Sequence, residues 1–400
     1  MRVLVATSTY PLASHEYWGN FIIDLNRRLE REGIATITLA PKCRCNNRQY
    51  LTESGLTTDE FDFFIPRRVQ ILGCPPGMEF NSRTLGGKFQ LPFYLFFFAL
   101  NLLKAALKRK PNLIHANWAI PAGLVSLFVG RLTNVPVLVT SHGADVYQRG
   151  IRKAIIKLVL DHADHVVAVS NHVKRLLLGF AGPKKLTVVP NAVDAEKILH
   201  CRENANISDI KNEFGISADQ KVVLTVRRLV PEKRLQDLVL AAPLVVKDTP
   251  NVKFVIAGDG PELGNLRALA TEKHASDHIL FLGGITEDQK MKLLSIADVT
   301  VQTSVQEGLS IALLEFMAAK TIVVASSSAG QSDIIVDGQT GLLFTATRID
   351  ELSKKIVHAL TQPDLNPIRE RASSLVLKEH SFGVQTEHYI DVYRRVISRT

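Results

Sequence analysis

Short runs of β-branched residues alternate with longer helical patterns along most of this chain. In the first half, strand-like runs occupy residues 3–6, 34–39, 113–116, 137–140, 166–169 and 186–189. The segments between them are long enough for crossover helices, which parallel strands require. This alternation is typical of βαβ units, so the sequence predicts an α/β protein with parallel sheets.

The alternation stops at a polar stretch, residues 195–219, and resumes after it. Strand-like runs then occupy residues 222–226, 252–256, 279–282, 299–301 and 322–325. A chain of 400 residues with 46% hydrophobic content exceeds what one hydrophobic core usually holds. We therefore expect two doubly wound domains, residues 1–193 and 194–378, with ligands bound at the carboxyl ends of the strands.

The charge and the cysteines limit the partners and the compartment. A formal net charge of +9 favours anionic partners such as nucleotide phosphates or an anionic membrane surface. Nucleic acid is not an expected partner, because the basic residues are dispersed and no base-reading element is present. Four irregularly spaced cysteines, Cys43, Cys45, Cys74 and Cys201, predict reduced thiols in a cytoplasmic protein.

A phenylalanine-rich segment at residues 91–103 is the strongest membrane signal in the chain. Its apolar run meets Asn101 and Lys104, so we expect it to be too short to span a bilayer. Two interpretations remain open: a buried helix that covers a parallel sheet, or an interfacial helix whose aromatic side chains enter the headgroup region beside basic residues.

Basic residues follow the strand-like run 222–226. Arg228 and Lys233 supply cationic donors suited to a diphosphate, and Lys233 lies near the start of the next expected helix. A cation there opposes the helix dipole unless an anion is bound nearby. The loop therefore predicts a phosphate site, with a solvated basic loop as the alternative.

Two glutamates flank the start of an apolar helix expected from residue 311. Glu307 precedes it, Ser310 is placed to cap it, and the amides of Gly308 and Leu309 face the same strand ends. Glu315 lies about one turn into the helix among apolar residues, where an unpaired charge is costly. Its partner could be the hydroxyl groups of a ribose or the cation of a buried salt bridge.

Two further turns follow strand-like runs. His142 and Asp145 frame a His-Gly-x-Asp sequence, and Gly258 and Gly260 lie in a tight turn that lacks the third glycine of a dinucleotide-binding fingerprint. The sequence has no Gly-x-x-x-x-Gly-Lys phosphate loop and no Asp-x-Asp pair. We therefore expect neither nucleotide hydrolysis nor a metal site.

Taken in order, these motifs resemble those of the retaining glycosyltransferases of family 4, and the resemblance covers nearly the whole chain. The matching positions are the Tyr10-Pro11 loop leading to Gly19, His142 to Asp145, Val169-Ser170, 189–194, Arg228 to Lys233, 257–260, Ser304, Glu307 to Glu315, and 337–341.

The resemblance implies a GT-B architecture, in which two Rossmann-like domains face each other across a cleft. The first domain would bind the acceptor and the second a nucleotide-sugar donor, while residues 379–400 would form a helix that crosses back to the first domain. No cofactor and no divalent metal are implied.

The resemblance also implies individual roles. Arg228 and Lys233 would bind the donor diphosphate, Glu307 the transferred sugar and Glu315 the ribose, while His142 would approach the sugar from the other domain. Further donor contacts would come from Gly19, Asp145, Gly258, Gly260, Ser304, Gly308, Leu309 and Ser310.

The implied reaction is transfer of a hexose from a UDP- or GDP-sugar to a glycan or lipid-linked acceptor, with retention of configuration. A sugar-nucleotide epimerase on the same fold and a non-catalytic nucleotide-sugar-binding protein are the alternatives.

The chain departs from the family where Arg227 and Arg234 replace residues that are commonly glycine, which adds positive charge beside the expected diphosphate site.

Overall fold

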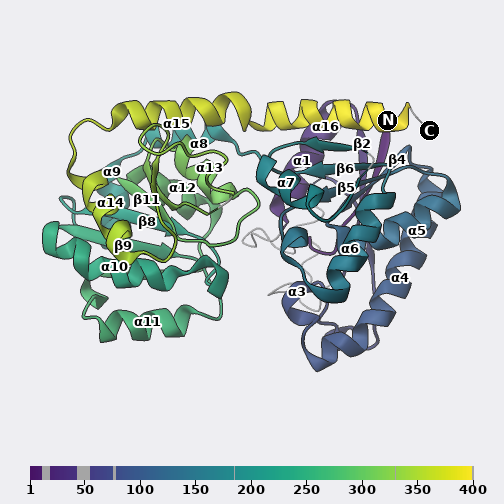
Figure 1. The fold of residues 1–400 in the computed structure, drawn as a ribbon, viewed down its shortest axis with the longest axis horizontal. Helices are drawn as coiled ribbons and strands as arrows, with labels where there is room; N and C mark the ends of the chain where they lie inside the picture. The colour runs from purple at the N-terminus through teal and green to yellow at the C-terminus, as the bar shows by residue number, and fades with distance from the viewer. Residues whose placement is uncertain (11–18, 43–54, 75–77, 184, 329, 399–400) are drawn as a thin grey trace. The chain divides into compact units, whose positions relative to one another are not determined.

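The computed structural model describes residues 1–10, 19–42, 55–74, 78–183, 185–328 and 330–398 (Figure 1). The chain forms two compact units. Unit 1 comprises Met1–Pro190 and Gln385–Thr400, and unit 2 comprises Asn191–Val384. Each unit is built around its own parallel sheet, so the predicted α/β class is confirmed.

The described part of unit 1 contains a seven-stranded parallel sheet in the order β3-β2-β1-β4-β5-β6-β7. The strands are β1 Arg2–Ala6, β2 Ala35–Pro41, β3 Thr57–Phe61, β4 Leu113–Asn117, β5 Val137–Ser141, β6 His165–Ala168 and β7 Leu186–Val188. Helices cover the sheet, and β4, β5 and β6 are buried along their whole length. This explains why these strands are continuous apolar runs rather than alternating ones.

The helices of unit 1 connect successive strands. They are α1 Asn20–Arg31, α3 Met78–Asn81, α4 Leu85–Arg109, α5 Leu124–Thr133, α6 Gly150–His162 and α7 Asn171–Leu178. The last helix, α16 Phe382–Ile397, joins unit 1 from Gln385 onward. Its Tyr393 hydroxyl lies 2.8 Å from Nδ1 of the buried His115, so the end of the chain is part of the unit 1 core.

Unit 2 repeats the architecture, with six described strands in the order β10-β9-β8-β11-β12-β13. They are β8 Lys221–Val226, β9 Val252–Ala257, β10 Ile279–Gly283, β11 Val299–Gln302, β12 Ile322–Ser326 and β13 Leu342–Phe344. The helices are α8 Ala195–Glu203, α9 Ile207–Glu213, α10 Leu235–Asp248, α11 Leu263–Glu272, α12 Glu287–Ile296, α13 Ile311–Ala318, α14 Ile349–Thr361 and α15 Asn366–Glu379. Because β8 lies between β9 and β11, the loops that follow these three strands meet at one edge of the sheet.

Helix α4 is longer than the phenylalanine-rich segment from which it was expected. It has 25 residues, and the Thr84 side chain caps it by accepting from the Gly87 amide. By length and composition alone it could cross a membrane, so the expectation that the segment is too short is wrong. A third of its most apolar window is buried, and Tyr94, Phe98 and Leu102 pack into unit 1. One side of the helix therefore covers the sheet, while Leu85, Phe89 and Phe96 on α4 are exposed, so the structure fits neither interpretation alone.

The cysteines differ from expectation at one described position. Cys74 is disulfide-bonded, whereas Cys201 is free. The prediction of a reduced thiol is therefore wrong for Cys74. A disulfide depends on the distance between two Cα atoms in the fold, which irregular spacing in the sequence does not reveal.

Candidate functional site

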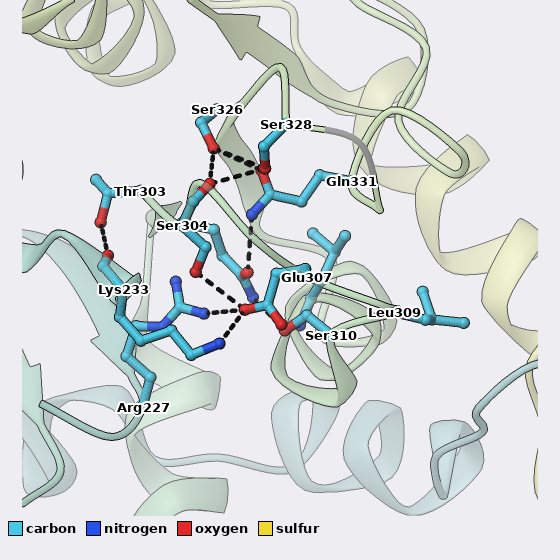
Figure 2. A network of polar contacts seen from close by, with 12 residues as sticks. Arg227, Lys233, Thr303, Ser304, Glu307, Leu309, Ser310, Ser326, Ser328 and Gln331 are labelled. Atoms are coloured by element: carbon cyan, nitrogen blue, oxygen red, sulfur yellow. Dashed lines mark hydrogen bonds and ion pairs between the residues drawn. The ribbon is translucent and has the colours of Figure 1, made fainter. Parts of the chain in front are cut away.

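The Glu307 carboxylate is the centre of a buried polar network in unit 2 (Figure 2). Its Oε1 lies 2.7 Å from Arg227 Nη2 and 2.7 Å from Lys233 Nζ, and it accepts a third bond from Ser304 Oγ at 2.9 Å. Only 12% of the Glu307 and Lys233 side chains and 5% of the Arg227 side chain are exposed. One carboxylate oxygen thus holds two cations that are both shielded from water.

The topology of the sheet brings these residues together. Arg227 follows β8, Lys233 ends the short 3-10 helix η4 Pro231–Lys233, and Glu307 lies between β11 and α13. The β8 and β11 loops are joined directly, since Thr303 Oγ1 donates to the Lys233 carbonyl at 2.7 Å. Residues 80 positions apart in the chain therefore meet at the carboxyl ends of adjacent strands.

The network carries more positive than negative charge. Burial alone would raise the pKa of the Glu307 carboxyl, but the attraction of Lys233 and Arg227 outweighs burial and lowers it. Burial lowers the pKa of Lys233 and of Arg227, and Glu307 offsets this only in part. Arg228, exposed beside them, adds further positive potential. An anion bound at this edge would relieve the excess charge.

A second layer of side chains holds the loop that carries Glu307. The Ser304 carbonyl accepts from Ser326 Oγ at 2.5 Å and from Ser328 Oγ at 2.7 Å, and Ser326 also bonds Gln331 Oε1 at 2.8 Å (Figure 2). A Cβ at Gly330 would lie 2.6 Å from the Glu307 carbonyl, which explains the glycine there. These residues escaped sequence analysis because nothing in their local pattern shows that they pack beneath residue 304.

The segment after Glu307 leads into α13 as expected. Ser310 caps the helix by accepting from the Leu313 amide at 3.3 Å, and Gln302 Nε2 donates to the same hydroxyl at 3.0 Å. The Leu309 carbonyl accepts from Asn191 Nδ2 at 2.9 Å, and both Gly308 and Leu309 are buried. The start of α13 therefore lies directly beside the Glu307 network.

Glu315 is not part of that network. Its Oε1 lies 2.5 Å from Lys290 Nζ on α12, and Lys290 also pairs with Glu287 at 2.9 Å. Of the two partners that the sequence left open for Glu315, the structure contains the cation of a buried salt bridge. The sequence offered one weak signal for it, the i, i+3 spacing of Glu287 and Lys290 on a helix, and Lys290 was missed as the partner of Glu315.

The two glycines of the turn after β9 shape the Arg227 loop. Gly258 has a φ of 135° and Gly260 a φ of 157°, and a Cβ at either would collide with the Arg227 or the Leu229 carbonyl. Backbone bonds join the loops, from Arg227 N to the Ala257 carbonyl and from Leu229 N to the Asp259 carbonyl, both 2.9 Å. These glycines permit the close approach that positions Arg227.

In unit 1, His142 lies among aromatic rings. Its ring centroid is 4.7 Å from that of Phe21 and 4.9 Å from that of Trp118, and its Nε2 lies 2.9 Å from Asn117 Oδ1. Burial, with a contribution from His115, lowers the pKa of His142 to about 3, so the imidazole is neutral. With Asn117 Oδ1 as acceptor, Nε2 carries the proton. No local pattern in the sequence pointed to Asn117, Trp118 or Phe21 as neighbours of His142.

The structure gives a local reason for an aspartate at position 145 and for a glycine at position 19. Asp145 is 3% exposed and accepts from the Ala119 amide at 3.1 Å, and burial raises its pKa to about 6. Gly19 has a φ of 81° where α1 begins, and this helix carries Phe21 to His142. The segment that precedes Gly19 lies outside the described residues.

The described residues contain no group of three or more histidine, cysteine, aspartate or glutamate side chains that could hold a metal ion. The candidate site itself contains the cations Arg227 and Lys233, the Ser304 hydroxyl and the start of α13, which are donors suited to phosphate oxygens and sugar hydroxyl groups.

Comparison with known protein families assigns the two parallel α/β units to a class of glycosyltransferases. The family model described as Glycosyl transferases group 1 matches residues 206–374, and the model described as Glycosyltransferase Family 4 matches residues 19–197. The chain belongs to family 4, a retaining glycosyltransferase family that uses nucleotide-sugar donors.

Individual relatives agree with this assignment. The chain is 25% identical over 331 residues to N-acetyl-alpha-D-glucosaminyl L-malate synthase of Bacillus anthracis, covering 80% of this chain and 85% of that protein. It is 26% identical over 303 residues to alpha-monoglucosyldiacylglycerol synthase of Streptococcus pneumoniae, covering 72% of this chain and 68% of that protein.

Solved structures share the fold, and they confirm the predicted GT-B class. Sucrose-phosphate synthase from Thermosynechococcus elongatus matches with a TM-score of 0.81 at 20% identity, over 100% of both chains. Anabaena HepE in complex with UDP-glucose matches with a TM-score of 0.78 at 17% identity, over 99% of this chain and 100% of that chain.

Proposed function

We propose that this glycosyltransferase moves a hexose-type sugar from a UDP- or GDP-sugar to a glycan or lipid-linked acceptor, without a divalent metal. The network of Arg227, Lys233 and Glu307 is the observation that carries the proposal. Two buried cations share one carboxylate there, so the excess positive charge favours binding of an anion such as a diphosphate. The UDP-glucose in the complex of Anabaena HepE supports UDP as the nucleotide.

In the proposed mechanism, Lys233 and Arg228 bind the diphosphate of the donor. As the bond to the sugar breaks, negative charge develops on the leaving diphosphate. Cations and helix amides that are already in place stabilise this charge without reorganising. Glu307, oriented by three donors, would contact the transferred sugar, and a leaving phosphate oxygen would take the proton of the acceptor hydroxyl on the same face.

Glu315 would bind the ribose despite its ion pair. A carboxylate can accept about four hydrogen bonds, so pairing with Lys290 through Oε1 is compatible with bonds from hydroxyl groups. The neutral His142 would hydrogen-bond the transferred sugar rather than act as an acid, because protonation is disfavoured in its buried position.

For the acceptor, an exposed apolar surface on unit 1 supports a lipid-linked molecule. We call it the aromatic face; it consists of Phe64, Ile65, Leu85, Phe89 and Phe93. The rings of Phe64, Phe89 and Phe93 lie 5.4–5.9 Å apart, while Ile65 is 89% and Phe89 65% exposed.

Basic residues lie close to members of the aromatic face in the chain. Arg68 and Lys88 are exposed, whereas Arg67 forms an ion pair with Asp62 at 2.8 Å. An apolar surface with adjacent cations suits the interface of an anionic membrane. The name of the Streptococcus pneumoniae relative, which indicates a lipid product, supports the same proposal. We therefore propose a peripheral position on the inner face of the cytoplasmic membrane, in cell-envelope or glycoconjugate synthesis.

A thermal-shift screen of UDP-, GDP- and ADP-sugars, followed by assays of donor hydrolysis, tests the donor proposal. A ligand that binds only the native state raises the melting temperature. We expect a selective shift with slow hydrolysis in the absence of acceptor. Formation of a free epimer of the donor sugar would favour the epimerase alternative, and a shift without any turnover would favour a non-catalytic binding protein.

A further inference from the structure

Arg227 is a buried guanidinium whose hydrogen-bonding capacity is largely unused. Nη2 donates to Glu307 Oε1 at 2.7 Å, but Nε and Nη1 are buried and have no hydrogen-bond partner among the residues that the structure describes. The side chain is 5% exposed, so bulk water does not hydrate it freely. Unpaired buried donors on a charged group are costly and are rare in folded proteins, so these two nitrogens indicate a missing acceptor.

Arg234, in the same loop, differs from Arg227 because its guanidinium is paired with a carboxylate of the protein. Its Nε and Nη2 each donate to a different oxygen of Asp237, both at 2.8 Å. Asp237 is 1% exposed, so this pair satisfies a buried carboxylate within the protein. Arg234 therefore has a structural partner, whereas the Arg227 side chain shares Glu307, its one side-chain partner among the described residues, with Lys233 and Ser304.

The charges around Arg227 specify what the missing acceptor is. Glu307 already accepts three bonds on Oε1, and its single negative charge faces two buried cations. The unbalanced charge is positive, so an anionic oxygen meets it better than a hydroxyl group or a carbonyl does. Phosphate and carboxylate oxygens have this chemistry.

We propose that Arg227 is a further donor-binding residue, whose Nε and Nη1 donate to an anionic oxygen of the bound nucleotide-sugar. The proposal rests on the proposed function. That oxygen belongs either to the leaving diphosphate or to a carboxylate on the transferred sugar. In both cases Arg227 would contact the donor directly while its Nη2 orients Glu307.

The first experiment compares wild type with Arg227→Met, which keeps the length of the side chain and removes its charge. Binding of UDP and of uridine is measured by calorimetry, with GDP and guanosine as a second pair. We expect the affinity for the diphosphate to fall by roughly 10- to 100-fold while the nucleoside is unaffected, as for loss of hydrogen bonds to a charged group. Arg348→Met, which removes an exposed arginine of unit 2, is the matched control.

A second pair of ligands locates the anionic oxygen. If Arg227→Met weakens UDP and UDP-glucose equally, the oxygen is on the diphosphate. If it weakens UDP-glucuronate alone, the oxygen is the sugar carboxylate. Either result supports the proposal. Because the variant could unfold, Arg227→Lys serves as the milder change, and we expect a partial loss of the same affinity.

Three results separate failure of this inference from failure of the proposed function. Unchanged affinity for every anionic ligand would overturn the inference alone. So would an equal loss for uridine and UDP, since that indicates a purely structural role. If the wild-type protein binds neither UDP nor GDP nor their sugars, the proposed function fails and the inference fails with it.

Discussion

Lys290 and Glu315 form an ion pair within unit 2, with 2.5 Å between Nζ and Oε1 and side-chain exposures of 8% and 12%. The family resemblance assigns Glu315 to the ribose, yet the protein itself already neutralises this carboxylate. Glu315 raises the pKa of Lys290 despite burial, so the pair stays charged over the physiological range. Removing Lys290 would take the nearest cation away from a carboxylate in a poorly hydrated position, whereas Lys290 also pairs with Glu287 at 2.9 Å.

We predict that Lys290→Met lowers the free energy of unfolding by about 3–5 kcal/mol, because the buried Glu315 carboxylate then loses the cation that neutralises it. Urea denaturation measures the change. Lys292→Met on the same helix is the control, since Lys292 pairs with the more exposed Glu213 and Asp288, and its loss should cost less than about 1 kcal/mol. Equal effects of the two variants would contradict the assignment of a buried pair.

Lys233→Ala should reduce turnover by on the order of 10²–10³-fold, by analogy with the loss of one preorganised donor to a developing anion. The assay is release of the nucleoside diphosphate from the donor identified by the screen. Lys247→Ala, an exposed position in α10, should leave turnover unchanged. A Lys233→Ala variant with near wild-type turnover would remove Lys233 from the mechanism.

Gly258→Ala should destabilise unit 2 by about 2–4 kcal/mol, through backbone strain and the collision of Cβ with the Arg227 carbonyl. Gly264→Ala in α11 is the control, because a Cβ there meets nothing within 4 Å. That change should alter stability by no more than about 1 kcal/mol, in the stabilising direction. Thermal melts compare the two, and similar melting temperatures would contradict the close packing of the loops.

The buried Asp145 should make stability depend on pH. Its pKa rises from 3.8 to about 6 on folding, so the native state favours the neutral carboxyl. The stability from this group is complete below about pH 4 and is lost as the pH rises through 6. Between pH 4 and pH 7.5, Asp145→Asn should gain about 3 kcal/mol relative to wild type, since one pKa unit is worth about 1.36 kcal/mol.

Urea denaturation of both proteins at the two pH values gives this difference. Asp161→Asn is a control at a carboxyl whose pKa shift has the opposite sign: the bonds from Lys157 and the Gly182 amide lower the pKa of Asp161 despite burial. The stability that Asp161 contributes is present above its unfolded pKa of 3.8 and is lost as the pH falls below it, so Asp161→Asn should show little change relative to wild type between pH 4 and pH 7.5. A pH-independent difference for Asp145→Asn would show that the carboxyl does not titrate as described.

The aromatic face should bind anionic vesicles. We expect the double variant Phe89→Ser, Phe93→Ser to reduce flotation with phosphatidylglycerol-containing liposomes by about tenfold or more, because two large apolar side chains no longer enter the interface. Ile207→Ser, an exposed apolar position in unit 2, is the control. Failure of the wild-type protein to bind at low salt would argue against membrane attachment.

The sequence by itself determined the elements of this protein and the chemical character of its candidate site. Hydrophobic periodicity is local, so the alternation of strand-like and helical patterns was enough to predict two sets of parallel strands. The helix cap at Ser310 was found for the same reason, because it depends on residues three positions apart. Lys233 and Glu307 were singled out because they lie in loops that follow strand-like runs, where ligands bind in α/β proteins.

Only the tertiary structure decided which side chains meet. Lys290 lies 25 positions from Glu315 and Arg227 lies 80 positions from Glu307, and no local pattern connects either pair. The same holds for Asn117 and Trp118 beside His142, and for the bonded state of Cys74. Periodicity reports the burial of a residue on one strand or helix, whereas an ion pair, a disulfide or an unpaired guanidinium depends on distances that exist only after the sheet has assembled.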